Sequence, residues 1–336
     1  MLSLTRLRIS MIATIAAIIS IATLVLTIVI MYLAGWSIAV MIFVLPLVII
    51  VHMLQWLFAP YIIESLYRVK HIDEHDRRYH WLISIVSELA RRSGLKTVPK
   101  IGIADIEIPN AFAYESPLTG PRIAITKRLL EIAPQDELEA ILAHELGHIK
   151  HRDVVVMMIV SIIPAIIYWL GNILMRIGIF GSVLEGPTSR RSSSTPIFAL
   201  LIGIVLIAIA VVFNLIVLYL SRLREYYADA HSVSIVPLGG TKLKRALTRI
   251  LIDTGYLKRL GLNISKYTHL KALFIADPEL SIRVRSRSLS PEVLDRIAEE
   301  IKSIEEASDI LSTHPHPAKR FRFLEEIEKS MYGYLV

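Results

Sequence analysis

The hydrophobic pattern of the chain begins with a long stretch that contains no Asp, Glu, Lys or Arg. This stretch covers residues 9–51, and a helix of that length would measure about 65 Å, roughly twice the thickness of a bilayer core. Gly35 and Trp36 lie near its middle. The pattern therefore predicts two membrane-spanning helices, residues 9–33 and 37–58, joined by a tight turn.

Two later stretches, residues 154–175 and 196–220, are also free of charged side chains. Runs of more than about 18 apolar residues are rare in the cores of soluble proteins, so each predicts a further span. The sequence thus predicts four spans in two hairpins. One hairpin lies within residues 1–60, and the other lies within residues 154–221 with an outer loop at residues 176–195.

The polar stretches, residues 61–153 and 222–336, are expected to form the two parts of one water-facing domain. Helices are expected at residues 76–93 with Trp81 on the apolar face, from Pro134 onward, from Thr241 as an N-terminal cap, and at residues 291–311. Short strands are expected at residues 100–107, 110–114 and 122–126. The predicted fold class is mainly α, with a small β-sheet in an α+β domain.

The helix that follows Pro134 contains the run His144-Glu145-Leu146-Gly147-His148. In this H-E-x-x-H pattern the two histidines are one turn apart and can bind one zinc ion, while Glu145 can take a proton from a water on the metal. Chance alone would produce about 0.02 copies in a chain of this composition. Two solvated surface histidines are therefore the weaker interpretation.

A catalytic zinc site needs a third ligand from the protein. His151 lies about 10 Å along the helix axis from His144, too far to share the ion. The metzincin pattern requires Gly at position 151 and His at position 154, but the chain has His151 and Val154. Both observations indicate that the third ligand lies on another helix.

The segment that continues the fourth span supplies a suitable carboxylate. Glu225 and Asp229 are four residues apart and share one helical face. We therefore expect Glu225 to be the third metal ligand and Asp229 to accept a hydrogen bond from a ligand histidine. On its own this spacing is also typical of a solvated helix face.

Composition narrows the chemistry and the partners. The chain contains no cysteine, which excludes thiolate ligands and a cysteine nucleophile. Its net charge is +7, but basic and acidic residues are nearly balanced within both polar stretches, and no nucleic-acid motif is present. The spans lack Asp, Glu, Lys and Arg, which argues against a transporter. We expect the lipid bilayer, and no nucleic acid, as a partner.

Basic residues near the span ends predict the orientation. They precede the first and third spans and follow the second and fourth spans, as the positive-inside rule requires for a cytoplasmic location of both termini and both polar stretches. These residues are Arg6, Arg8, Arg68, Lys70, Arg77, Arg78, Lys150, Arg152, Arg222 and Arg224. Arg176, Arg190 and Arg191 in the outer loop weaken the asymmetry. The prediction is a multi-pass protein of the cell membrane with a cytoplasmic domain.

In the order of its motifs the chain resembles the membrane-embedded zinc metalloproteases of the HtpX heat-shock type, which are relatives of the CAAX prenyl proteases. The shared segments are Asn110-Ala111-Phe112-Ala113, the H-E-x-x-H run, Glu225-Tyr226-Tyr227-Ala228-Asp229-Ala230, Thr313-His314-Pro315 and Arg320. The resemblance implies a gluzincin-like domain, one zinc ion on His144, His148 and Glu225, and Glu145 as the general base. His316 departs from the family, where Pro is common.

The resemblance also implies peptide-bond hydrolysis, with misfolded or damaged membrane proteins as substrates. A specific processing protease of the prenyl-protease type and a catalytically silent membrane scaffold are the alternatives. His314 is a candidate donor to the oxyanion, with Arg320 as support; otherwise the His314 segment caps the helix that contains Arg320. Asn110, Ala111, Phe112 and Ala113 could pair with an extended substrate or form an ordinary hairpin strand.

Overall fold

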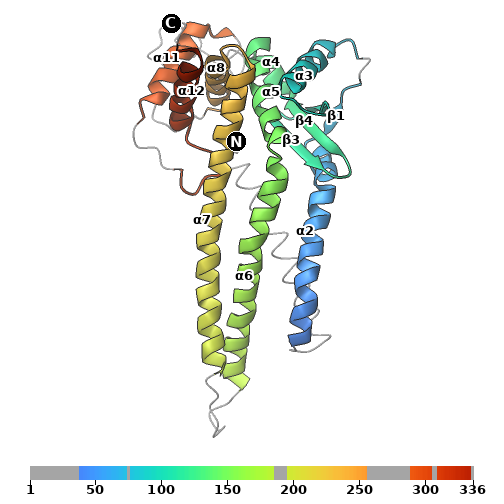
Figure 1. Cartoon of the computed structure of the whole chain (residues 1–336), viewed down its shortest axis with the longest axis vertical. Helices are drawn as coiled ribbons and strands as arrows, with labels where there is room; N and C mark the ends of the chain where they lie inside the picture. The colour runs from blue at the N-terminus through green and yellow to red at the C-terminus, as the bar shows by residue number, and fades with distance from the viewer. Residues whose placement is uncertain (1–37, 74–75, 185–194, 256–287, 305–308, 334–336) are drawn as a thin grey trace, which may run out of the picture.

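The computed structural model describes residues 38–73, 76–184, 195–255, 288–304 and 309–333. Three long helices extend in one direction, and shorter helices and a small sheet gather at one end of them (Figure 1). This mostly helical arrangement with a small mixed sheet agrees with the predicted fold class.

The three long helices are α2 (Ile38–Leu66), α6 (Asp153–Leu184) and α7 (Thr195–Ile235), and each is long and apolar enough to cross a membrane. They contain three of the predicted spans. The predicted span at residues 9–33 lies outside the described residues. α6 and α7 pack closely along their length, and a Cβ atom at Gly203 would collide with the backbone of Met175.

The sheet contains β1 (Val69–His71), β2 (Lys100–Ala104), β3 (Ala111–Ser116) and β4 (Gly120–Thr126) in the order β1-β2-β4-β3. β2 and β4 are parallel, and the other two pairs are antiparallel. β1 was not predicted, because three residues with mostly exposed side chains show no alternation of burial. β3 lies at one edge of the sheet.

One threonine fixes the entry into β3. The Thr126 hydroxyl accepts hydrogen bonds from the backbone N–H of Leu129 and of Asn110, at 3.2 and 2.9 Å. Thr126 thereby caps the following helix and also holds Asn110 against the end of β4. The side of β3 that faces away from β4 is left for other partners.

The shorter helices are α3 (His80–Arg92), α4 (Lys127–Ile132), α5 (Gln135–Lys150), α8 (Gly239–Asp253), α11 (Pro291–Lys302) and α12 (Pro317–Tyr332). α5 lies at the centre, packed against α3, α7, α8 and β3. Apolar side chains of its middle turns, with those of α3 and of the sheet, form the main core. This central position explains why α5 is buried on nearly all sides.

Several predicted boundaries were wrong. α3 begins at His80 rather than residue 76, because the Asp76 carboxylate accepts the Arg78 N–H in a turn, and Trp81 is 38% exposed. Thr241 is not the cap of α8, since its hydroxyl donates to Glu328. α11 ends at Lys302 rather than at residue 311.

Candidate active site

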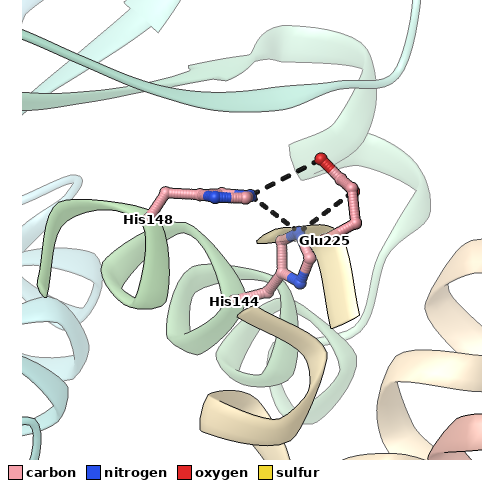
Figure 2. Close-up of side chains that lie close together, drawn as sticks. All are labelled: His144, His148 and Glu225. Carbon is pink, nitrogen blue, oxygen red and sulfur yellow. Dashed lines mark hydrogen bonds and ion pairs between the residues drawn. The ribbon is translucent and has the colours of Figure 1, made fainter. Parts of the chain in front are cut away.

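The centre of the site is formed by three side chains from two helices. Figure 2 shows His144 and His148 on α5 converging with Glu225 on α7. The Nε2 atoms of the two histidines are 3.2 Å apart, and each lies 3.7 Å from a Glu225 oxygen. The sequence predicted this grouping, and the three residues could hold a metal ion.

The other nitrogen of each imidazole faces a carboxylate. His144 Nδ1 lies 2.9 Å from Asp229 Oδ1, and His148 Nδ1 lies 2.6 Å from Asp153 Oδ2. Carboxylates favour the tautomer with a proton on Nδ1, which leaves both Nε2 atoms as acceptors. Two acceptors cannot hydrogen-bond each other, whereas a cation between them attracts both.

The spacing also suits a particular cation. Two histidine nitrogens on a tetrahedral zinc ion are about 3.3 Å apart, given zinc–nitrogen bonds of about 2.0 Å. The observed 3.2 Å is close to this value. Two imidazoles and one carboxylate, without a cysteine, are the donor set of the H-E-x-x-H class of zinc sites. The residues present therefore fit zinc.

Each of the two carboxylates is paired with an arginine. Arg320 Nε lies 2.9 Å from Asp229 Oδ2, and Arg224 pairs with Asp153. Burial lowers the pKa of Arg320, but the nearby Asp229 and Glu225 carboxylates outweigh burial, so the pKa lies above its ordinary value. We call Asp229 with Arg320 the inner pair, and Asp153 with Arg224 the membrane-side pair.

Gly147 sets the distance between the two helices that carry the site. A Cβ atom at this position would lie 3.1 Å from the Cα of Ala228 and 3.1 Å from the Cβ of His231, both on α7. These contacts are tighter than ordinary van der Waals contacts. The glycine of the motif therefore allows α5 to approach α7 closely enough for the histidines to meet Glu225.

Glu145 connects the site to the edge strand. It is 8% exposed, and its Oε2 accepts a hydrogen bond from the backbone N–H of Ala113 at 2.9 Å. Both residues line a cavity of about 490 Å³, together with Asn110, Ala111 and Phe112. A substrate chain in this cavity would lie between the strand and the histidines.

His314 reaches the site from the segment before α12. Its Nδ1 lies 2.9 Å from Glu225 Oε1, and its side chain is 36% exposed. The Ser221 hydroxyl on α7 donates to the carbonyl of Thr313 at 2.9 Å and fixes this segment. The cap of α12 is the neighbouring His316, whose ring accepts the N–H of Ala318. The alternative interpretation of His314 as a cap residue is therefore wrong.

Sequence reasoning missed the membrane-side pair. In the sequence, Asp153 stands out only as the last polar residue before a span, and Arg224 only as an orientation charge. A signal was present, because Asp153 is the first residue of α6 and follows His148 by five positions. His151 lies outside the grouping, as predicted, at the end of α5.

An H-E-x-x-H helix joined to long apolar helices defines the class of membrane metalloproteases. The chain belongs to peptidase family M48, whose family model matches residues 76–328. It is 39% identical to the protease HtpX homolog of Aeropyrum pernix over 304 residues, which are 90% of each chain. It is 36% identical to protease HtpX homolog 2 of Saccharolobus solfataricus over 298 residues, covering 88% of this chain and 89% of the relative.

A solved structure shows the same fold. The crystal structure of S. mikatae Ste24p aligns with a TM-score of 0.54 and 22% identity, covering 94% of this chain and 65% of that longer chain. The predicted relationship to HtpX-type proteases is confirmed by the family match and the curated relatives. The protein is a membrane metalloprotease.

Proposed function

We propose that the protein is a zinc-dependent endopeptidase that cleaves misfolded or damaged membrane proteins on the cytoplasmic side. The observation that carries the zinc assignment is the pair of Nε2 acceptors 3.2 Å apart, both facing Glu225. His144, His148 and Glu225 would hold the ion. When bound, zinc supplies a Lewis acid that polarises the scissile carbonyl and lowers the pKa of a water molecule.

Glu145 is the residue we assign to proton transfer. Its carboxylate accepts a proton from the attacking water and passes that proton to the nitrogen of the leaving amine. The hydrogen bond from the Ala113 N–H orients Glu145 toward the cavity. A glutamate next to the ligands has no purpose in a structural metal site, which favours an enzyme over a silent scaffold.

His314 is our candidate for stabilising the oxyanion, a role worth about 3 kcal/mol for a single donor. It is positioned beside Glu225 and is partly exposed to the cavity. Arg320 supports the role indirectly, because its Nη1 lies 3.5 Å from Glu225 Oε2. If His314→Ala binds zinc normally and loses less than about threefold in kcat, His314 has no catalytic role.

We propose that substrate pairs with the edge of β3 that faces away from β4. The carbonyl of Asn110 bonds to the N–H of Thr126 in the neighbouring strand, so the alternate residues Ala111 and Ala113 direct their backbone groups away from β4. Both line the cavity and have small side chains. Backbone pairing suits an enzyme that cleaves many unrelated sequences.

Proline at position 113 is a poor test of this pairing, since it also removes the N–H that orients Glu145. Backbone-methylated peptide substrates leave the protein unchanged. Methylation of alternate substrate nitrogens should raise KM about tenfold or more, and methylation of the intervening nitrogens should have little effect. Equal effects at every position would mean that the substrate is held in another way.

We propose that the site faces the cytoplasm. Arg68 follows α2, Arg152 precedes α6, and Arg224 follows the apolar part of α7, where these helices meet the polar part of the structure, as the positive-inside rule requires. In intact cells, a protease added outside should then cut only within residues 181–195. Cleavage within residues 71–100 from outside would reverse the orientation.

The experiment that tests the proposed function compares the purified protein with Glu145→Gln. Both should bind one zinc ion per chain, and only the parent should degrade a loosely folded membrane protein. Normal turnover by Glu145→Gln would refute the mechanism. A set of cleavage sites restricted to one C-terminal motif would favour the specific processing protease, and absence of cleavage by the zinc-loaded parent would favour the scaffold.

A further inference from the structure

Two apolar side chains stand out at the surface of the C-terminal polar part. Ile310 is 61% exposed and Leu311 is 81% exposed, and no other large apolar side chain of the described residues is as exposed as Leu311. They are adjacent in the chain and belong to residues 309–312, which we call the 309–312 loop. Adjacent exposed apolar residues of this kind commonly mark a contact surface.

The loop is held where the uncharged part of α7 ends. One guanidinium nitrogen of Arg222 lies 2.9, 3.1 and 2.9 Å from the carbonyl oxygens of Asp309, Ile310 and Ser312. Arg222 is the first charged residue after the apolar run of α7. Figure 1 shows that the segment before α12 extends along α7, past the shorter helices and toward the part of the structure that contains only the long helices.

The neighbouring surface of α7 has the character of a membrane boundary. Ile216 and Tyr219 are 52% and 56% exposed. The Arg222 guanidinium lies 5.8 Å from the centre of the Tyr219 ring. Tyrosine and arginine at the end of an apolar helix are typical of the interface between lipid and water.

We propose that Ile310 and Leu311 insert into the interfacial region of the bilayer that α7 crosses, so that the 309–312 loop is a membrane contact in addition to the long helices. The loop continues the lipid-facing surface of α7. We therefore infer that lipid, rather than another protein, contacts Ile310 and Leu311. Irregular backbone is tolerated near hydrocarbon only when its polar groups are satisfied. Arg222 and the backbone N–H of Ser312 together donate hydrogen bonds to three of the carbonyls in this loop.

This contact links lipid to the active site. Leu311 precedes His314 by three residues, and His314 Nδ1 lies 2.9 Å from Glu225. A loop anchored in the interface restrains the short segment that carries His314. The inference does not depend on the catalytic role of His314, because it concerns where the loop lies.

The absence of cysteine makes a direct test simple. The full-length Leu311→Cys variant is labelled with the polarity-sensitive fluorophore NBD and reconstituted into phosphatidylcholine vesicles, with or without nitroxide-labelled lipid. The matched control is Met331→Cys, a large apolar residue that is 48% exposed at the far end of α12. Zinc binding of each variant confirms that it is folded.

Nitroxide lipid should quench the Leu311→Cys label at least twofold and leave the Met331→Cys label nearly unchanged, while aqueous iodide should show the reverse. Ile310→Cys should behave as Leu311→Cys does. Equal quenching of the Leu311→Cys and Met331→Cys labels by nitroxide lipid would overturn the proposal. A shielded label that responds to protein concentration and not to nitroxide lipid would also overturn it, and would indicate a second copy of the chain.

Discussion

The two histidines of α5 are supported by similar groups in two different environments. In the inner pair, Asp229 is fully buried, and its partner Arg320 comes from α12 within the polar part. In the membrane-side pair, Asp153 is the first residue of α6, and Arg224 follows the apolar part of α7. One histidine is thus oriented by the core of the polar part, and the other by the first residue of α6 and by the part of α7 that follows its apolar run.

This difference separates two ways of disturbing the site. Damage to the inner pair leaves a charge in a dry environment and should affect folding as well as the metal. Damage to the membrane-side pair should affect folding less, because the Asp153 side chain is 11% exposed whereas that of Asp229 is 0% exposed, and because Arg224 also reaches the carbonyl of His151. The predictions below test this contrast, beginning with the largest expected effect.

Removing either histidine should have the same large effect, whichever carboxylate–arginine pair supports it, because the metal needs both histidines. His144→Ala and His148→Ala should each lose stoichiometric zinc and lower kcat/KM by several orders of magnitude, about as much as Glu225→Ala. Metal analysis of the purified variants, together with peptide cleavage, measures both effects. Zinc retained at full occupancy in His148→Ala would exclude that residue as a ligand.

Asp229→Ala should produce the next largest effect. It leaves Arg320 without its closest partner in a buried site, which should cost about 3–5 kcal/mol of stability. Zinc affinity, measured by competition with a chelator, should fall about 10- to 100-fold. Adding Arg320→Met should recover stability and leave the affinity low, and recovery of both would contradict an orienting role for Asp229.

Asp153→Ala should lower zinc affinity about tenfold and have little effect on the unfolding midpoint. The reason is that His148 loses the carboxylate that orients its ring, while Arg224 keeps its hydrogen bond to the carbonyl of His151. Asp153→Asn keeps an acceptor and should lose less. Asp136→Asn, at an exposed position on α5, is the matched control and should change neither quantity.

Gly147→Ala should give the smallest effect and should act on both histidines together. The added methyl group must displace Ala228 and His231 by a few tenths of an ångström, at a cost of about 1 kcal/mol. Zinc affinity should fall a few-fold because α5 moves away from Glu225. Unchanged affinity with lowered stability would show that the ligands adjust independently of the helix spacing.

The parts of the site that follow from local spacing were predictable. His144, His148 and Glu145 share a single helical motif, and Glu225 and Asp229 are one turn apart on another helix. Three spans were predictable because uncharged runs of about 20 or more residues are rare outside membrane helices. These features depend on neighbours in the sequence and need no knowledge of tertiary packing.

The membrane-side pair was not predictable in the same way. Arg152 has a positive φ of 53°, which separates α5 from α6 and turns Asp153 back toward His148. Arg224 then reaches Asp153 from 71 residues away in the sequence. A backbone break followed by a distant contact leaves no periodic pattern.

The continuity of α7 has a consequence for how this enzyme could evolve or be engineered. One unbroken helix of 41 residues contains both a membrane segment and the positions of Glu225 and Asp229. A deletion that removed the membrane segment would also remove the support of the active site, so trimming cannot convert this protein into a secreted or soluble protease. A change of one residue in the length of α7 between Leu220 and Glu225 would rotate Glu225 by about 100° about the helix axis. Lineages of this enzyme should therefore tolerate insertions in loops and exclude them from this stretch of helix.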